Sequence, residues 1–166
     1  HNPTYSTAYG HASRIAPGLD EVGVFLPYSP LHQLLLEAFG GPLVATSGNV
    51  SGEPVLTSVE EASVRLAGVA DAFLHHDRPI VRPADDSVVR VVRGRPLMLR
   101  RARGYAPWPV DLGTDAPSVV GLGAHLKNTV AITAGSQLVV SQHIGDLATA
   151  RALDAFHAAL DSLSHL

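Results

Sequence analysis

The sequence predicts a mixed α/β fold (α+β) in which short strands alternate with a few capped helices. Short apolar runs typical of buried strands are separated by segments with helix caps and helical spacing. The triplet Arg93-Gly94-Arg95 lies between two strand-like runs and has the pattern of a hairpin turn. A stretch rich in Pro, Gly and Asp, Asp111 to Pro117, interrupts this pattern, which then restarts. The chain is therefore expected to contain parts of two domains.

The elements before the first polar loop are predicted from apolar runs and caps. Val22 to Leu26 is expected to be a short strand. Ser29 followed by Pro30 is a helix start, because a Ser oxygen accepts from a free N–H group and Pro suits the first helical turn. The helix is expected to run from Leu31 to Phe39 and to end at Gly40-Gly41. Pro42 to Ala45 is expected to be a buried strand.

The next elements follow the same reasoning. Ser58-Val59-Glu60-Glu61 is a capping box, so a helix is expected from Val59 to Leu66. Ala72 to Leu74 is expected to be a strand. Ser87 to Val92 and Pro96 to Leu99 should pair as the two arms of the hairpin.

After the Pro/Gly/Asp-rich stretch, three strands and one long helix are expected. Gly135-Ser136 is the turn between the last two strands. The strands are Val119 to Leu122, Val130 to Thr133 and Leu138 to Val140, and the helix is Ala148 to Leu163. Apolar residues recur at helical spacing on that helix, which predicts a core-facing side made of Leu153, Phe156, Leu160 and Leu163.

Composition excludes several classes of protein. The chain has 166 residues with 46% hydrophobic content, enough for a sizeable core, and no apolar run approaches membrane-spanning length. No secretory signal is recognisable, and the absence of cysteine excludes disulfides and cysteine-ligated zinc within this chain. A net charge of -3 argues against general nucleic-acid binding. A cytoplasmic protein is expected. The chain begins at His1 rather than Met, and residues 1–10 are interpreted as a tag, linker or joined remnant.

The loop Thr46 to Pro54 carries the strongest local signal for ligand binding. It contains two glycines, two serines, a threonine and an asparagine between a predicted strand and a predicted helix. Glycines let backbone N–H groups approach a ligand, and hydroxyl and amide groups add donors. Such a loop suits phosphate or another anion. An ordinary polar turn would have the same composition, so the loop alone leaves both readings open.

Arginines concentrate in one part of the chain. Eight of the twelve basic residues are arginines between Arg78 and Arg103, and the only acids in that stretch are Asp85 and Asp86. A guanidinium group matches phosphate and carboxylate geometry. Arg90, Arg93 and Arg95 are expected on a solvated hairpin, whereas the cluster from Arg100 to Arg103 is a stronger candidate for binding.

The second part offers a different candidate. Lys127-Asn128-Thr129 occupies a polar turn between two strands, an arrangement that also contacts terminal phosphates in actin-like ATPases, although turn residues without any such role would look the same. The nine histidines have no spacing typical of metal ligands, and no metal site is predicted.

Seven phrases in the same order give the chain a close resemblance to the HypF-type carbamoyltransferases that act in nickel–iron hydrogenase maturation. The phrases are Leu26–His32, Thr46–Pro54, His76–Ile80, Asp85–Arg90, Leu99–Tyr105, Gly123–Thr129 and Ser141–Leu147. The resemblance runs from about Val22 to Leu166. Each phrase is weak alone, but seven in this order are very specific.

The resemblance implies that the first part is the later portion of a YrdC-like domain, with a twisted sheet around a basic cavity. That domain binds ATP, with an inferred Mg²⁺, and makes a carbamoyl-adenylate with release of pyrophosphate. The residues implied to contact the nucleotide or carbamoyl-adenylate are Ser47, Asn49, Ser51, Ser87, Arg101 and Arg103. Asp86 stands where related proteins have Ser, which puts the role of Ser87 in doubt, and spacing does not choose between Arg101 and Arg103.

The second part is implied to be the first hairpin and helix of an actin-like ATPase-superfamily domain. In the family, this domain transfers the carbamoyl group from carbamoyl phosphate to the C-terminal cysteine of a HypE-type partner, which leads to the cyanide ligands of the hydrogenase. The residues implied to line a second nucleotide pocket are Lys127, Asn128, Thr129, His143 and Asp146.

These resemblances set the expected domain limits. They are 11–107 for the YrdC-like part, 108–117 for a linker and 118–166 for an incomplete actin-like part. The family's acylphosphatase domain, zinc fingers and metal-binding histidine motif are not seen in these residues. The chain alone is therefore expected to be incomplete as an enzyme.

Other functions share parts of this pattern. A threonylcarbamoyl-adenylate synthase would share the first loop, and another O-carbamoyltransferase would share the actin-like part. A non-catalytic module that binds ATP or double-stranded RNA is a further alternative, although the net charge argues against strong RNA affinity. The segment Gly123–Thr129 and the phrase Asp85–Ser87 favour the HypF-type interpretation.

Overall fold

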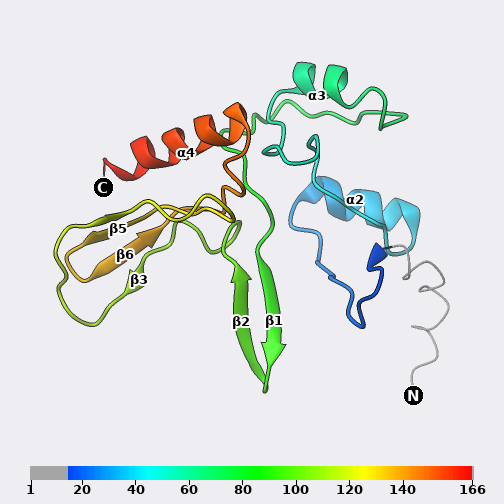
Figure 1. Ribbon diagram of the computed structural model, residues 1–166. Coiled ribbons are helices and arrows are strands. Elements are labelled where there is room, and N and C mark those ends of the chain that lie inside the picture. Colours follow the sequence, from blue (N-terminus) through cyan, green and yellow to red (C-terminus); the bar gives the residue numbers. More distant parts are fainter. Residues whose placement is uncertain (1–14, 166) are drawn as a thin grey trace. The chain divides into compact units, whose positions relative to one another are not determined.

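A computed structural model describes residues 15–165 of the chain, and the stretch 1–10 interpreted as a tag or linker lies outside them. The chain divides into two compact units, His1–Thr46 and Ser47–Leu166. Within the described residues the fold is mixed helix and sheet, as predicted (Figure 1).

The described part of the first unit contains one well-defined helix, α2, from Pro30 to Phe39. The Ser29 side chain accepts a hydrogen bond from the His32 N–H, and Gly40 closes the helix in the left-handed conformation at φ 76°. Both ends of this helix therefore agree with the prediction from its caps.

Two segments that flank this helix in the sequence were predicted to be strands, and neither forms one. Residues 22–26 and 42–45 have no strand pairing, and Val24 and Val44 are 81% and 75% exposed. The predicted strand at 72–74 in the second unit is also absent, and Leu74 there is 64% exposed. A strand exists only when a partner satisfies its backbone hydrogen bonds, and an apolar run alone does not supply that partner.

The second unit begins with the loop 47–58 and helix α3, from Val59 to Arg65. The Ser58 hydroxyl accepts from the Glu61 N–H at 3.2 Å, which confirms the predicted cap. An antiparallel hairpin follows, with β1 from Val88 to Val92 and β2 from Arg95 to Arg100. Arg93 and Gly94 both have positive φ at its turn, as the Arg-Gly-Arg signal predicts.

A four-stranded antiparallel sheet follows in this unit, in the order β3-β6-β5-β4. Its strands are β3 Val110–Asp111, β4 Val120–Gly121, β5 Ala131–Ala134 and β6 Gln137–Val140. Strand β3 lies inside the predicted linker 108–117 and pairs with β6, so part of that segment belongs to the sheet.

Helix α4, from Ala150 to Leu163, packs against the sheet (Figure 1). Val130, Val139 and Leu163 form the core, and Phe156 and Leu160 pack against them. Leu153 was expected in this core but is 42% exposed, because the buried face of α4 runs through Ala152, Ala159 and Leu163 and Leu153 lies beside that face. None of the helices within residues 15–165 is long and apolar enough to cross a membrane.

Candidate functional site

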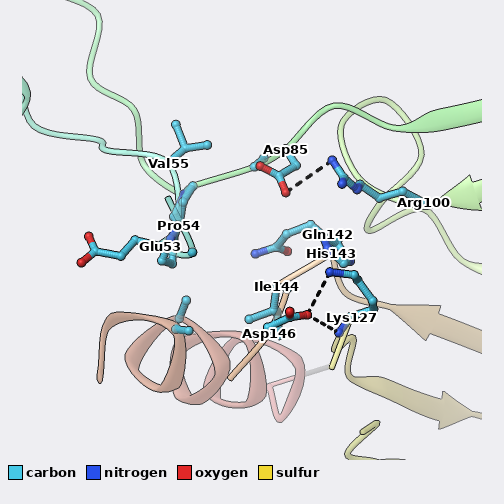
Figure 2. Close-up of a pocket in the computed structure, with 16 residues that line it drawn as sticks. Glu53, Pro54, Val55, Asp85, Arg100, Lys127, Gln142, His143, Ile144 and Asp146 are labelled. Carbon is cyan, nitrogen blue, oxygen red and sulfur yellow. Dashed lines mark hydrogen bonds and ion pairs between the residues drawn. The ribbon is translucent and has the colours of Figure 1, made fainter. Parts of the chain in front are cut away.

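A cavity of about 240 Å³ lies within the second unit and is lined by residues from six separate segments (Figure 2). They come from the end of the 46–54 loop, the segment before β1, the end of β2, the Lys127 turn, the segment 142–146 and helix α4. The charged or titratable lining residues are Glu53, Asp85, Arg100, Lys127, His143 and Asp146. This is a polar cavity of mixed charge.

Two ion pairs lie in the wall of this cavity. The Lys127 ammonium contacts Asp146 Oδ1 at 3.1 Å, and the Lys127 backbone N–H donates to the same oxygen at 2.9 Å. Arg100 Nη1 lies 3.7 Å from Asp85 Oδ2. Figure 2 shows both pairs around His143. The hydrogen bonds from Lys127 hold the pKa of the Asp146 carboxyl below its usual value.

His143 lies between these two pairs. Burial lowers the pKa of its imidazole, and the Arg100 guanidinium lowers it further. The ring is therefore neutral near pH 7, with one nitrogen free to accept a hydrogen bond. Its backbone N–H donates to the Arg101 carbonyl at 3.0 Å, which ties this segment to the end of β2.

Asn128, the next residue, is 1% exposed, and its side chain stabilises the Lys127 turn. Its amide nitrogen donates to the carbonyls of Leu122 and Ala124 at 2.9 and 2.7 Å. Gly123 faces this amide at φ 71°, and a Cβ there would overlap Asn128 and the Thr129 carbonyl. Lys127 itself has φ 52°, so the turn directs its side chain to the cavity through a left-handed backbone.

The structure therefore brings three of the second set of predicted residues, Lys127, His143 and Asp146, to one cavity. Asn128 supports the turn from below, and Thr129 is half-buried outside the lining. Whether these residues bind a nucleotide stays a prediction.

The first set of predicted residues is arranged differently. Ser47 and Ser51 are exposed on the 46–54 loop, and only the residues after them, Gly52 to Val55, line the cavity. Asn49 donates through its amide to the carbonyls of Val50 and Glu53 at 3.0 and 3.1 Å. Asn49 therefore shapes the loop.

Ser87, Arg101 and Arg103 surround the buried Ala102 and contact the backbone. The Ser87 hydroxyl accepts from the Ala102 N–H and donates to the Arg103 carbonyl. Arg101 donates to the carbonyls of Val140 and Trp108, and Arg103 donates to that of Ala84. In this structure all three side chains hold neighbouring segments together.

The sequence prediction missed Arg100 as a cavity residue, since it could not choose a phosphate binder among the arginines. No spacing in the sequence indicates which arginine pairs with which of the two acids in this stretch. Asp85 pairs with Arg100, while Asp86 lies 3.6 Å from Arg103. Within residues 15–165 no group of three or more acidic or histidine side chains could hold a metal ion.

Comparisons with known proteins agree with this organisation. The Sua5/YciO/YrdC family model, described as telomere recombination, matches residues 6–102, and the HypF Kae1-like domain model matches residues 114–166. Because the first match covers more than half of the chain, the chain belongs to the Sua5/YciO/YrdC family.

Within that family, the chain is similar to HypF proteins across both matched parts. The carbamoyltransferase HypF of Synechocystis sp. (strain ATCC 27184 / PCC 6803 / Kazusa) is 52% identical over 153 residues, which cover 92% of this chain and 20% of that protein. That of Rhizobium leguminosarum bv. viciae is 49% identical over 146 residues, covering 84% of this chain and 19% of that protein. The chain thus spans about a fifth of the length of these relatives.

Two solved structures have the same fold. A full-length HypF crystallised in a phosphate- and nucleotide-bound form matches with a TM-score of 0.82 and 42% identity, over 88% of this chain and 23% of that one. The HypF of T. kodakarensis matches with a TM-score of 0.85 and 34% identity, over 93% of this chain and 20% of that one. The predicted resemblance and fold class are confirmed.

Proposed function

We propose that this chain is part of an ATP-dependent carbamoyltransferase that uses carbamoyl phosphate and passes through a carbamoyl-adenylate. The observation that carries the proposal is identity of about half to proteins named carbamoyltransferase HypF, continuous across both matched parts. A threonylcarbamoyl-adenylate synthase would account for the first part alone, and a match to the HypF Kae1-like domain favours the carbamoyltransferase.

Formation of carbamoyl-adenylate requires groups that stabilise the charge on the leaving pyrophosphate. Carbamoyl-adenylate forms when a carbamate oxygen bonds to the α-phosphorus of ATP and the bond to pyrophosphate breaks. Carbamoyl phosphate must give up its phosphate to water to supply that oxygen, so phosphate and pyrophosphate both leave. Negative charge develops on the departing pyrophosphate, and fixed donors stabilise it.

The residues of this chain supply donors of that kind in two places. The 46–54 loop carries the hydroxyls of Ser47 and Ser51, both exposed and outside the cavity lining. The cavity itself is lined by Arg100 and Lys127, each already paired with a carboxylate. An anionic ligand would compete with Asp85 and Asp146 for these cations, and neutral His143 could accept a proton beside them.

We propose further that the carbamoyl group passes to the C-terminal cysteine of a HypE-type acceptor. A thiolate attacks the carbamoyl carbon, a C–S bond forms, and AMP leaves as the C–O bond breaks. Intact-mass measurement of the acceptor tests this step with the full-length protein, ATP and carbamoyl phosphate. One added carbamoyl group is expected on the native acceptor and none after its C-terminal cysteine is changed to Ala. Equal modification of both acceptors would contradict the proposed target.

A further inference from the structure

An ion-pair network at the edge of the cavity joins the two parts of the chain that match different families. Its members are Glu53, at the end of the 46–54 loop, Glu61 and Arg65 on α3, and Arg151 on α4. The first three fall in the Sua5/YciO/YrdC match and Arg151 falls in the HypF Kae1-like match. All four belong to the same compact unit.

Each arginine of this network bridges both carboxylates. Arg65 lies 2.8 Å from Glu53 and 3.3 Å from Glu61. Arg151 contacts the two oxygens of Glu61 at 2.5 and 3.3 Å, and its Nε lies 3.7 Å from Glu53. Arg65 donates hydrogen bonds to both carboxylates, as its planar group of fixed donors allows. Arg151 donates to Glu61 alone, and its Nε approaches Glu53 as an ion pair without a hydrogen bond, so its main link to the loop runs through Glu61 and Arg65.

The network is neutral and half-buried. The four side chains are between 18% and 37% exposed. Burial alone would raise the pKa of Glu61, but the hydrogen bonds from Arg65 and Arg151 outweigh it and hold the pKa below its usual value. Removing one member leaves an unequal number of charges, whereas removing an oppositely charged pair leaves the remainder balanced.

The position of Arg151 on its helix also favours these partners. It stands in the first turn of α4, where the helix dipole disfavours a cation and where α4 has no acidic residue of its own. Glu53 and Glu61 bring negative charge to that turn, although they stand 98 and 90 residues before Arg151 in the chain.

Glu53 connects this network to the cavity. Its residue lines the cavity, while Figure 2 shows its carboxylate pointing away from Lys127 and His143. Its backbone carbonyl accepts from Asn49, and its N–H donates to Val50. The conformation of the loop is thus tied through one side chain to the first turn of α4.

We propose that Arg151 is a positioning residue that holds the 46–54 loop in place from the HypF Kae1-like part of the chain. Through Glu53 and Glu61 it fixes the loop that carries Ser47, Asn49 and Ser51. The consequence for adenylation rests on the proposed function: a residue outside the YrdC-like match would set how well that part binds ATP.

Hydrogen–deuterium exchange on the full-length protein tests the positioning role without using activity. The reporters are the loop amides of Glu53 and Leu56, which donate to the carbonyls of Val50 and Gly48. The variant Arg151→Met should speed their exchange about fivefold, the factor that corresponds to the upper range for exposed ion pairs. Arg95→Met, which removes an exposed arginine of the hairpin, is the matched control and should leave it unchanged. Unchanged loop exchange in Arg151→Met would overturn the proposal.

A second variant keeps the test decisive if Arg151→Met folds poorly. Glu61→Gln should speed exchange of the same amides, and the double variant Arg151→Met/Glu61→Gln should exchange no faster than Arg151→Met alone, because it restores charge balance. Fully additive acceleration would show that the two residues act separately and would contradict the network.

A kinetic measurement separates this proposal from the proposed function. In carbamoyl-phosphate-dependent exchange of labelled pyrophosphate into ATP, Arg151→Met should raise KM for ATP more than it lowers kcat, since the loop is displaced but its groups remain. A fall in kcat alone would contradict a role in positioning the loop. If the unaltered protein shows no exchange of label, the proposed function fails. The hydrogen–deuterium exchange of the loop amides still tests the role of Arg151 in that case.

Discussion

Asn49 shows how a single side chain can set the conformation of a loop that carries candidate binding groups. Its amide donates to the carbonyls of Val50 and Glu53, which lie one and four residues further along the same loop. These bonds fold the loop so that its serine hydroxyls stay exposed. The amide thereby serves preorganisation, since donors held in place lose less entropy when a ligand binds.

Replacing Asn49 with Ala should weaken ATP-dependent adenylation while the melting temperature changes little. The two lost hydrogen bonds should cost only about 0.5 kcal/mol each, the low end of the usual range, because the loop lies at the surface and water replaces the lost donor. Asn49→Asp keeps the size of the side chain but not its donors, and should raise KM for ATP to the same extent. Equal losses of activity and melting temperature in both variants would favour a purely structural turn.

Gly123 is the second residue with a sharp local requirement. A Cβ at this position would overlap Asn128 and the Thr129 carbonyl, and the backbone has φ 71°. Gly113 has nearly the same backbone, at φ 69°, with no atom within 4 Å of a Cβ. Gly123→Ala should therefore cost about 1–3 kcal/mol more than Gly113→Ala, the range for overpacking. Thermal melting of the two variants measures the difference, and equal melting temperatures would rule out the overlap.

Among the elements, helices and the hairpin follow from local signals, whereas several strands do not. Ser29, Ser58 and Gly40 cap helices through groups within four residues, so the sequence alone predicts those ends. The segments 22–26 and 42–45 look like strands from their apolar residues but lack strand partners. Pairing depends on residues distant in sequence, which a local pattern does not contain.

The same distinction applies to the candidate site. Lys127, His143 and Asp146 were predicted from motifs, and the structure places them together. Arg100 and Glu53 join them through tertiary contacts with Asp85 and Arg151, and no spacing in the sequence indicates those pairs.

Helix α4 gives a test of the core at the scale of one element. Leu163 is 6% exposed within the core, whereas Leu153 is 42% exposed on the same helix. Leu163→Ala should cost about 2–5 kcal/mol through lost burial and a cavity, and Leu153→Ala should cost clearly less. Denaturant midpoints of the two variants measure this, and equal shifts would mean that the helix packs by a different face.

At the scale of the whole molecule, opposite charges tie distant segments together and make the fold sensitive to acid. Lys127 holds Asp146, and the network of Glu53, Glu61, Arg65 and Arg151 joins α3 to α4. Both Glu61 and Asp146 have pKa values below their usual ones because of these partners, although burial opposes the effect.

Stability should therefore fall as the pH drops below the usual carboxyl range. The unfolded chain binds protons at about pH 4.3 for Glu and 3.9 for Asp, before the folded chain does. The stabilisation is complete above those values and is lost as pH falls through the lower folded pKa values. Melting temperatures of the native protein and of Asp146→Asn should converge on acidification. A difference that stays constant from neutral pH to pH ~3 would contradict the pairing of Asp146 with Lys127.

The central claim is that the YrdC-like part forms carbamoyl-adenylate, and pyrophosphate exchange tests it most directly. Full-length protein is incubated with ATP and labelled pyrophosphate, with and without carbamoyl phosphate. We expect label to enter ATP only when carbamoyl phosphate is present, because reversal of adenylation is the step that incorporates it. Consumption of ATP without any exchange of label would contradict the claim and indicate release of phosphate by another route.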